Sequence, residues 1–403
     1  MKPRILILMH YMELGGAESA MLGLLQSVDP NKVDVDVFIY SHCGELMTYL
    51  PLERVSLLPE IEAYSLTEKP MGKVVKRGYW KLAVARMIGR RNTASFCKKH
   101  RDSDKPAECG TFFQQRATWK VLPQIQPEVE YDLAISFLTP HFFVLNNVHA
   151  KKKIGWIHTD YTRILIDVEA ELKMWQRLDY IASISEEVGN RFCEVFPSLR
   201  NKLIQIENIL NADFIRKRAD EISVSLCDDP SVVNLLTIGR FSPPKRMEEI
   251  PMICKKVTEK GISVRWYIIG YGSEEIESIV RENAEKEGVV DKVVILGKKE
   301  NPYPYIKACD IYVQPSRYEG KSITVREAQI LCKPVIITNY PTAKSQVQDG
   351  IDGIIVPLDV DECAQQMAGF ISNNEKQQEI IRYLETHDYG NEIEVNKIYD
   401  LLR

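Results

Sequence analysis

Two glutamates, Glu319 and Glu327, lie eight positions apart in a stretch whose residue types suit a phosphorylated ligand. The apolar run Asp310–Pro315 predicts a buried strand before them, and Ile323–Leu331 predicts a helix after Gly320. A glycine turn between a strand and a helix collects unpaired backbone N–H groups at the positive end of the helix dipole. We therefore expect an anion to bind there, with Glu319 facing the ligand and Glu327 lying deeper. Taken singly, Glu319 also suits a solvated turn, and Glu327 a first-turn carboxylate that favours the helix dipole.

Two cations, Arg240 and Lys245, follow another predicted strand that begins at Val232 and ends at Gly239. Two prolines between the cations stiffen the loop. Cations at this spacing can clamp a diphosphate, and arginine can grip it through two hydrogen bonds. A solvated basic turn is the alternative.

In the N-terminal part, Arg4–His10 predicts a buried parallel strand, which Gly15, Gly16 and a helical apolar face follow. Glycine lets the backbone approach a ligand closely, and a helix N-terminus favours phosphate. The same pair is also an ordinary entry into a helix. A further strand ends at His158, where open α/β sheets bind ligands. Asp160 either receives an acceptor hydroxyl or caps the next segment.

The composition is normal for a soluble globular protein, with 45% apolar and 27% charged residues and a net charge of −4. A length of 403 residues favours two domains. The nine cysteines are scattered, odd in number and without a Cys-x-x-Cys pair, which favours reduced thiols over a disulfide framework or a zinc site. The chain opens with no signal peptide pattern, and no stretch of about 18 apolar residues predicts a membrane span.

Positive charge is concentrated between Lys69 and Arg101, a segment with 11 lysines and arginines and no acidic residue. Tryptophan, tyrosine and aliphatic residues are interleaved with the charges. This pattern is typical of an amphipathic segment on an anionic membrane surface. One alternative is a basic face whose apolar side packs on its own domain. A nucleic-acid patch is disfavoured, because no nucleic-acid-binding motif accompanies it.

The alternation of strands and helices predicts an α/β protein with two doubly wound, Rossmann-like domains. The first covers residues 1–212 and carries the basic insertion at about 69–101. The second covers residues 213–385, and a C-terminal helix covers residues 386–403. We place the link between the domains at Asn211–Asp229, which mixes charges and lacks an apolar period.

The sequence around the two glutamates resembles glycosyltransferase family 4, the capsular and exopolysaccharide-type group 1 enzymes of the retaining GT-B class. The resemblance rests on Glu319 and Glu327 after a strand and Pro-Ser, on Gly-Gly-Ala-Glu from Gly15, and on Gly-Arg followed by Lys245. It is most specific over residues 232–358. It implies a GT-B fold, in which the two domains face a central cleft and the last helix crosses back to the first domain.

The resemblance also implies a role for each candidate residue. Glu319 lies beside the donor sugar, His158 contacts that sugar, and Glu327 hydrogen-bonds the nucleotide ribose. Arg240 and Lys245 bind the donor diphosphate and help the leaving group depart. The remaining donor-binding positions are Gly15, Gly16, Gly239, Ser322 and Ile323. The sequence departs from the family at Arg246, where glycine is frequent, and at Lys321, where an apolar residue or proline is frequent.

By the same resemblance, the activity is a retaining sugar transfer from a nucleotide-diphosphate donor, UDP favoured, without a metal or another cofactor. Glu319 acts either as a covalent nucleophile or, as we expect, as an electrostatic partner while the leaving phosphate deprotonates the acceptor. The basic segment suggests a glycan acceptor linked to polyprenyl diphosphate, used in cell-surface polysaccharide synthesis. We then expect a cytoplasmic enzyme held peripherally on the inner face of the membrane.

Other classes of protein stay open. A sugar-nucleotide epimerase or a glycan phosphorylase can share the two-domain plan, and the phosphorylase needs a pyridoxal lysine. A non-catalytic, nucleotide-sugar-binding partner of another transferase would bind ligand without turnover. An NAD dehydrogenase is disfavoured, because the first glycine turn lacks the full Gly-x-Gly-x-x-Gly pattern.

Overall fold

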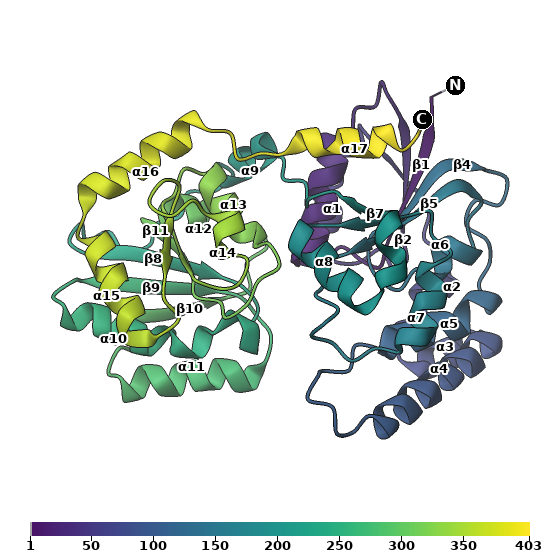
Figure 1. Cartoon of the computed structure of the whole chain (residues 1–403), viewed down its shortest axis with the longest axis horizontal. Helices are drawn as coiled ribbons and strands as arrows, with labels where there is room; N and C mark the ends of the chain where they lie inside the picture. Colours follow the sequence, from purple (N-terminus) through teal and green to yellow (C-terminus); the bar gives the residue numbers. More distant parts are fainter. Residues whose placement is uncertain (1) are drawn as a thin grey trace. The chain divides into compact units, whose positions relative to one another are not determined.

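The computed structural model describes residues 2–403, which divide into two compact units (Figure 1). The first unit runs to Ile209 and also contains Glu392–Arg403, and the second is Leu210–Asn391. The sequence placed these divisions after residues 212 and 385. Leu210 belongs to the second unit because its side chain is buried in that core and its N–H donates to Asn391 Oδ1 at 2.8 Å.

The first unit is built on a seven-stranded parallel sheet with the order β3-β2-β1-β4-β5-β6-β7. Its strands are β1 (Arg4–Met9), β2 (Asp34–Ile39), β3 (Ser56–Leu57), β4 (Tyr131–Ser136), β5 (Ala150–Ile157), β6 (Tyr180–Ser183) and β7 (Leu203–Gln205). The sheet order reverses at β1, as in a doubly wound fold. The central strands are almost wholly buried, which explains their continuous apolar runs.

The helices of the first unit are α1 (Gly16–Ser27), α2 (Glu62–Ser65), α3 (Met71–Lys76), α4 (Trp80–Lys99), α5 (Gly110–Thr118), α6 (Phe142–Asn146), α7 (Val168–Trp175), α8 (Glu186–Val195) and α17 (Val395–Asp400). The last of these confirms the predicted return of the chain, although it is shorter than residues 386–403. Tyr399 of α17 accepts a hydrogen bond from the Asp29 N–H at 2.9 Å, and Lys152 Nζ donates to the Leu401 carbonyl at 2.7 Å.

The second unit is built on a six-stranded parallel sheet with the order β10-β9-β8-β11-β12-β13. Its strands are β8 (Val233–Ile238), β9 (Val264–Ile269), β10 (Val293–Gly297), β11 (Ile311–Gln314), β12 (Val335–Thr338) and β13 (Ile354–Val356). Its helices are α9 (Ala212–Ala219), α10 (Ile250–Glu259), α11 (Glu274–Lys286), α12 (Tyr303–Ala308), α13 (Ile323–Ile330), α14 (Ala343–Gln346), α15 (Val360–Ile371) and α16 (Asn374–Thr386). The prediction of two doubly wound α/β domains is therefore confirmed.

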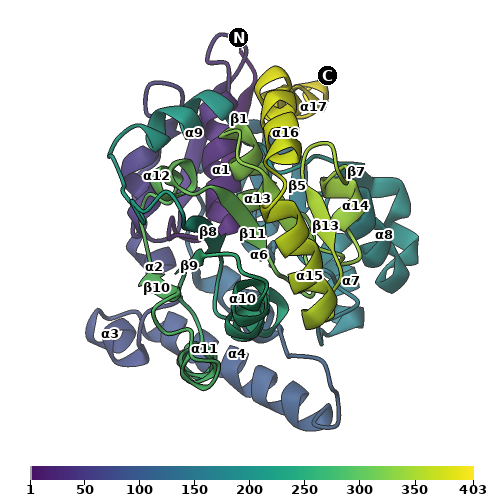
Figure 2. The same cartoon turned by 90° about the vertical axis from the view of Figure 1, so that its left-hand side faces the viewer.

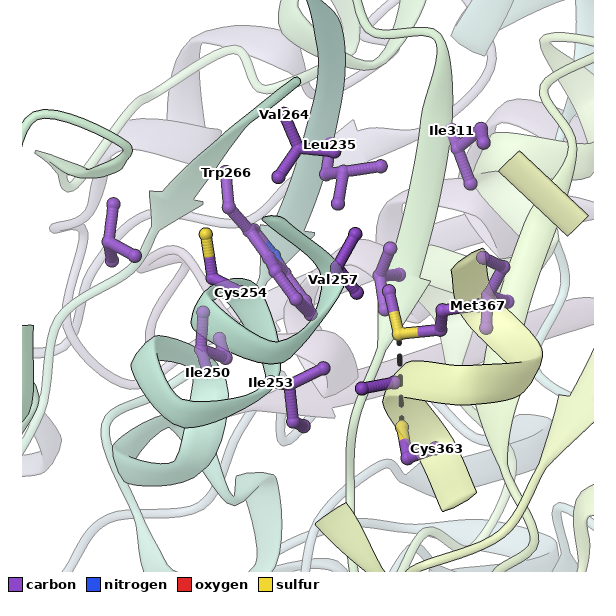
Figure 3. Packing of buried hydrophobic residues seen from close by; sticks show 14 of the residues in the cluster. Leu235, Ile250, Ile253, Cys254, Val257, Val264, Trp266, Ile311, Cys363 and Met367 are labelled. Atoms are coloured by element: carbon purple, nitrogen blue, oxygen red, sulfur yellow. Dashed lines mark hydrogen bonds between the residues drawn. The ribbon is translucent and has the colours of Figure 1, made fainter. Parts of the chain in front are cut away.

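Helices cover both faces of the second sheet. One face packs against α10, α11, α15 and α16, and α10 and α15 lie side by side on it (Figure 2). Trp266 of β9 fills the centre of this layer, next to Ile253 and Val257 of α10 (Figure 3). Its indole N–H is buried but satisfied, because it donates to Thr237 Oγ1 at 2.9 Å. The other face packs against α9, α12, α13 and α14.

The predicted interdomain link at Asn211–Asp229 is wrong over its first half. Asn211 caps α9 through its side chain, which accepts from the Phe214 N–H at 2.8 Å. Ala212, Ile215 and Ala219 of α9 are buried in the second unit. The helical apolar period was concealed by the charged residues between these positions.

The basic segment forms α3 and α4. Leu82, Arg86 and Gly89 of α4 face the first unit, and the buried Arg86 guanidinium donates to the carbonyls of Leu66 and Lys69 at 2.8 and 2.6 Å. No helix within residues 2–403 combines the length and the apolar content that crossing a bilayer needs.

Candidate functional site

Glu319 and Lys245, predicted from separate motifs, are in direct contact at the carboxyl edge of the second sheet. Lys245 Nζ lies 2.6 Å from Glu319 Oε1, and both side chains are largely shielded from solvent. The same oxygen accepts from Ser316 Oγ at 2.6 Å and from Gln314 Nε2 at 3.1 Å. Glu319 Oε2 has no hydrogen-bond partner within residues 2–403. One carboxylate oxygen is thus fixed by three donors, and the other remains for a ligand.

Arg246, at a position where the resembled family often has glycine, holds the Lys245 loop in place. Arg246 has a left-handed backbone, φ +57° and ψ +32°, which glycine adopts most readily. Its buried guanidinium is anchored by Glu249 Oε2, 2.8 Å from Nε, and by the Leu358 carbonyl. Arg317 N–H also donates to the Pro244 carbonyl at 2.8 Å, which ties this loop to the segment that carries Glu319.

Arg240 lies apart from this pair. Its side chain is exposed, and its guanidinium has no hydrogen-bond or ion-pair partner within the described chain. Gly239 precedes it, at a point where two strand ends approach closely. A Cβ on Gly270 would lie 1.9 Å from the Gly239 carbonyl oxygen, so the end of β9 requires glycine.

Ser322 is the N-cap residue of α13, but its side chain makes no capping hydrogen bond. Its N–H donates instead to Gln346 Oε1 at 3.0 Å, so this amide is already paired, and the donor-binding role of Ser322 stays a prediction. Within residues 2–403 the structure gives no partner for the N–H groups of Ile323, Thr324 and Val325. Within α13 itself, the amides available to an anion therefore begin at Ile323.

Glu327 is buried in the first turns of α13. Its Oε1 accepts a hydrogen bond from Tyr303 OH at 2.9 Å. Burial raises the pKa of Glu327 to about 7, and the Tyr303 hydrogen bond opposes this shift. Glu327 therefore sits near the balance between its protonated and ionised forms at neutral pH.

Gly15 and Gly16 of the first unit stand at the start of a helix, as the alternative to a phosphate-binding role predicts. Gly15 is the N-cap of α1, which has no side-chain cap. A Cβ on Gly15 would lie 2.2 Å from Glu18 Oε2, so the Glu18 carboxylate lies over the N-terminus of the helix. This carboxylate occupies part of the space where the sequence predicted a phosphate, so that role for Gly15 and Gly16 stays a prediction.

His158 follows β5 and is neutral. Burial lowers its pKa to about 4, and a hydrogen bond to the Phe137 backbone opposes the shift. The ring packs on Phe137 with centroids 4.9 Å apart. Its Nε2 is buried and has no partner within residues 2–403. A neutral ring whose other nitrogen bonds a carbonyl presents Nε2 as an acceptor, which suits a hydroxyl group.

Asp160 accepts hydrogen bonds within its own turn, and the N-cap of the next helix, α7, is Asp167. Asp160 Oδ1 accepts from the Thr162 N–H at 2.8 Å and from Thr162 Oγ1 at 2.6 Å, and Asp160 Oδ2 lies 3.4 Å from Arg163 Nε. Of the two predicted alternatives, these contacts favour the structural role, in a turn and not at a helix start. The acceptor role stays a prediction.

Sequence reasoning missed two polar side chains that hydrogen-bond Glu319. Gln314 and Thr342 are buried, and Thr342 Oγ1 donates to the Glu319 carbonyl at 2.9 Å. A glutamine inside the apolar run of β11 was the available signal. Within residues 2–403, no three His, Cys, Asp or Glu side chains form a group that could hold a metal ion.

The family model of glycosyl transferases group 1 matches residues 229–387. This segment lies within the second unit and makes up 159 of the 403 residues. It contains Gly239, Arg240, Lys245, Glu319 and Glu327, together with the two loops that meet at the Lys245–Glu319 contact.

Two curated relatives share part of the sequence. An uncharacterized glycosyltransferase of Methanocaldococcus jannaschii is 29% identical over 259 residues, which is 58% of this chain and 61% of that protein. The UDP-Gal:alpha-D-GlcNAc-diphosphoundecaprenol alpha-1,3-galactosyltransferase of Escherichia coli is 27% identical over 126 residues, 31% of this chain and 33% of that protein. The matched parts thus span less than two thirds of either relative.

Solved structures match over the whole chain at low identity. HepE of Anabaena, in complex with UDP, matches with a TM-score of 0.63 at 14% identity. The match covers 99% of this chain and 98% of HepE. TarM matches with a TM-score of 0.68 at 12% identity. The match covers 100% of this chain and 99% of TarM. The chain therefore has the GT-B fold.

Proposed function

We propose that this chain is a retaining glycosyltransferase that moves a sugar from a nucleotide-diphosphate donor, UDP favoured, to a glycan acceptor. The observation that carries the proposal is the Lys245–Glu319 contact beside the uncapped start of α13, inside the group 1 domain. The UDP bound in HepE and the UDP-Gal donor in the name of the Escherichia coli relative favour UDP as the nucleotide.

In this proposal Arg240, Lys245 and the first amides of α13 hold the donor diphosphate. Charge develops on the leaving phosphate oxygen, where preorganised cations and N–H dipoles stabilise it. These groups do the work that a divalent cation does in other transferases, so no metal or other cofactor is required. Glu327 accepts a hydrogen bond from the ribose.

Glu319 is proposed as an electrostatic partner of the sugar rather than as a covalent nucleophile. Its Oε1 already accepts hydrogen bonds from Lys245, Ser316 and Gln314, and a carboxylate stabilised in this way is a weak nucleophile. The leaving phosphate then takes the proton of the acceptor hydroxyl on the same face of the sugar, which retains the anomeric configuration.

The proposed acceptor is a glycan on polyprenyl diphosphate, used in cell-surface polysaccharide synthesis, and the enzyme works on the inner face of the cell membrane. The support comes from one side of α4, where the apolar residues Trp80, Val84, Met87 and Ile88 are 64%, 57%, 61% and 51% exposed. Exposed cations surround them at Lys76, Lys81, Arg90 and Arg91. Exposed apolar side chains beside cations suit an anionic bilayer.

The donor site is tested by thermal shift and calorimetry with UDP-, GDP-, ADP- and TDP-sugars, because a ligand stabilises the state that it binds. Stabilisation by one nucleotide, lost in Glu327→Ala and Arg240→Ala, supports the site. NMR of the product then reports the anomeric configuration. An inverted product overturns retention, and an isomerised nucleotide-sugar without any acceptor indicates an epimerase.

The membrane surface is tested by flotation with vesicles that contain anionic lipid. The test variant replaces Lys76, Arg77, Arg90 and Arg91 by glutamine. A matched control replaces four exposed lysines elsewhere, Lys151, Lys173, Lys260 and Lys286. Equal flotation of both variants and the wild type would exclude this surface.

A further inference from the structure

Gln314 connects Glu319 with the start of α13. It is the last residue of β11 and is fully buried, at a position where the rest of the strand is apolar or aromatic. A buried amide is costly unless its hydrogen bonds are satisfied, and all the polar atoms of Gln314 have partners.

The charge of Glu319 fixes the orientation of the Gln314 amide. An ionised carboxylate only accepts hydrogen bonds, so the amide nitrogen must face it. Gln314 Nε2 donates to Glu319 Oε1 at 3.1 Å and to Ser316 Oγ at 2.8 Å. Gln314 Oε1 then faces the hydroxyls of Tyr312 at 2.7 Å and Thr324 at 3.2 Å, which donate to it. The reversed amide would place its oxygen against the carboxylate.

The direction set by Glu319 continues to the N-cap of α13. Since the Thr324 hydroxyl donates to Gln314, it accepts from Ser322 Oγ, which lies 3.1 Å away. The Ser322 side chain is thus turned toward Thr324, and in this orientation it makes no capping hydrogen bond. Two other N-cap serines behave differently: Ser185 accepts from the Val188 N–H at 3.2 Å, and Ser273 accepts from the Ile276 N–H at 3.3 Å.

We propose that Gln314 is a positioning residue of the donor site. The Gln314 amide nitrogen donates to Glu319, and the Gln314 amide oxygen accepts from Thr324. Through Thr324, Gln314 keeps the Ser322 side chain in an orientation that does not cap α13. The amides at the start of α13 thus stay available to the donor diphosphate. This inference rests on the proposed function, because it assigns the freed amides to a nucleotide diphosphate.

Three substitutions separate the two branches of this hydrogen-bond chain. Thr324→Val keeps the shape of the side chain and frees Ser322, so we expect UDP binding to weaken by about tenfold with little change in kcat. Ser316→Ala removes a donor to Glu319, so we expect kcat to fall by about tenfold with UDP binding unchanged. Gln314→Met should show both effects.

Gln329→Met is the matched control. Gln329 is equally buried, on α13, and donates to the Asp352 carbonyl at 3.2 Å; within residues 2–403 it shares no hydrogen bond with Gln314, Ser316, Glu319, Ser322 or Thr324. Because this change removes one hydrogen bond and a buried Oε1 that has no partner within residues 2–403, we expect a smaller loss of Tm than in Gln314→Met, with the UDP dissociation constant and kcat unchanged. If both variants change binding and turnover in proportion to the loss of Tm, Gln314 is a packing residue and the inference is overturned.

A crystal structure of Thr324→Val gives a readout that does not depend on activity. The inference expects Ser322 Oγ to turn and cap α13. A Ser322 side chain that keeps its orientation, with unchanged UDP affinity, overturns the inference while the proposed function stands. If the wild type binds UDP and no variant changes binding, the positioning role alone fails. If the wild type binds no nucleotide at all, the proposed function fails and takes this role with it.

Discussion

The carboxyl edges of the two sheets hold their predicted site residues in different ways. In the second unit, three strand-end loops contribute Lys245, Glu319 and Thr342 to one network of hydrogen bonds. In the first unit, Asp160 bonds to its own turn, and Gly15 lies against Glu18 of its own helix. Residues bonded in a network respond together when one is changed, whereas locally bonded residues respond singly. The comparison therefore predicts large, non-additive effects in the second unit and small, additive ones in the first.

The largest effect is expected from the Lys245–Glu319 pair. Lys245→Met leaves the buried Glu319 carboxylate without its cation, and Glu319→Gln removes the charge that orders its donors. We expect each change to lower kcat/KM by about 10²–10³-fold, because preorganised charge at a reacting centre typically contributes that much. Steady-state kinetics with the nucleotide-sugar identified by the binding screen measures it.

The double variant Lys245→Met/Glu319→Gln sharpens the comparison. In a network the second change costs little, so its kcat/KM should lie near that of the worse single variant. Lys256→Met is the control, since Lys256 is paired with Asp361 outside the network. Losses that multiply in the double variant would break the comparison.

The next effect concerns two buried carboxyls, one in each unit. Burial raises the pKa of Glu327 to about 7, and it raises the pKa of Glu171, which accepts from Trp175 Nε1 at 3.4 Å, to about 7 as well. The ordinary value is 4.5. Between these values the unfolded chain loses the proton while the folded chain keeps it, so each group lowers stability as pH rises from about 4.5 to 7.

Replacing either carboxyl by an amide removes this loss. In urea unfolding, we expect the free energy of unfolding to fall less between pH 5 and pH 8 in Glu327→Gln and Glu171→Gln than in the wild type. Only Glu327→Gln should weaken UDP binding, by about tenfold, because only that carboxylate is proposed to bind the ribose. Equal loss of UDP affinity in both variants would argue against a specific ribose contact.

Much of the fold followed from apolar periods, because buried parallel strands and amphipathic helices leave continuous or periodic apolar runs. The same rule failed at α9, where Arg216, Lys217 and Arg218 stand between buried Ile215 and Ala219. The strand-end motifs predicted Lys245 and Glu319 separately, and only the folded chain shows that they touch.

The braces of the site could not be predicted in the same way. Gln346 accepts a hydrogen bond from the Ser322 N–H, although the two residues are 24 positions apart in the sequence, and no local sequence pattern indicates such a contact. Arg246 has a left-handed backbone, and its buried side chain is held by Glu249, which is partly exposed. Such contacts depend on loops meeting in space, which composition and spacing do not encode.

A smaller effect is expected at His158. Because its pKa of about 4 keeps the ring neutral, His158→Ala should raise KM for the nucleotide-sugar by about tenfold at most, through one lost acceptor at Nε2. The pH dependence of kcat/KM between pH 5.5 and 8 should keep its shape, which pH-resolved kinetics can check. A limb of that profile that disappears in the variant would show that His158 titrates during turnover.

The smallest effect is expected at Asp160, the residue whose two interpretations the contacts separate most clearly. Asp160→Asn keeps an oxygen that can accept from the Thr162 N–H and hydroxyl, and it removes only the charge opposite the half-exposed Arg163. An ion pair with one exposed partner contributes little, so stability and kcat should change by less than about threefold. Asp160→Ala, which also removes the two hydrogen bonds from Thr162, should destabilise the turn without a specific loss of kcat. If Asp160→Asn instead lowers kcat by orders of magnitude while Tm is kept, the carboxylate acts on the acceptor, and the first unit carries a catalytic group that its local bonding conceals.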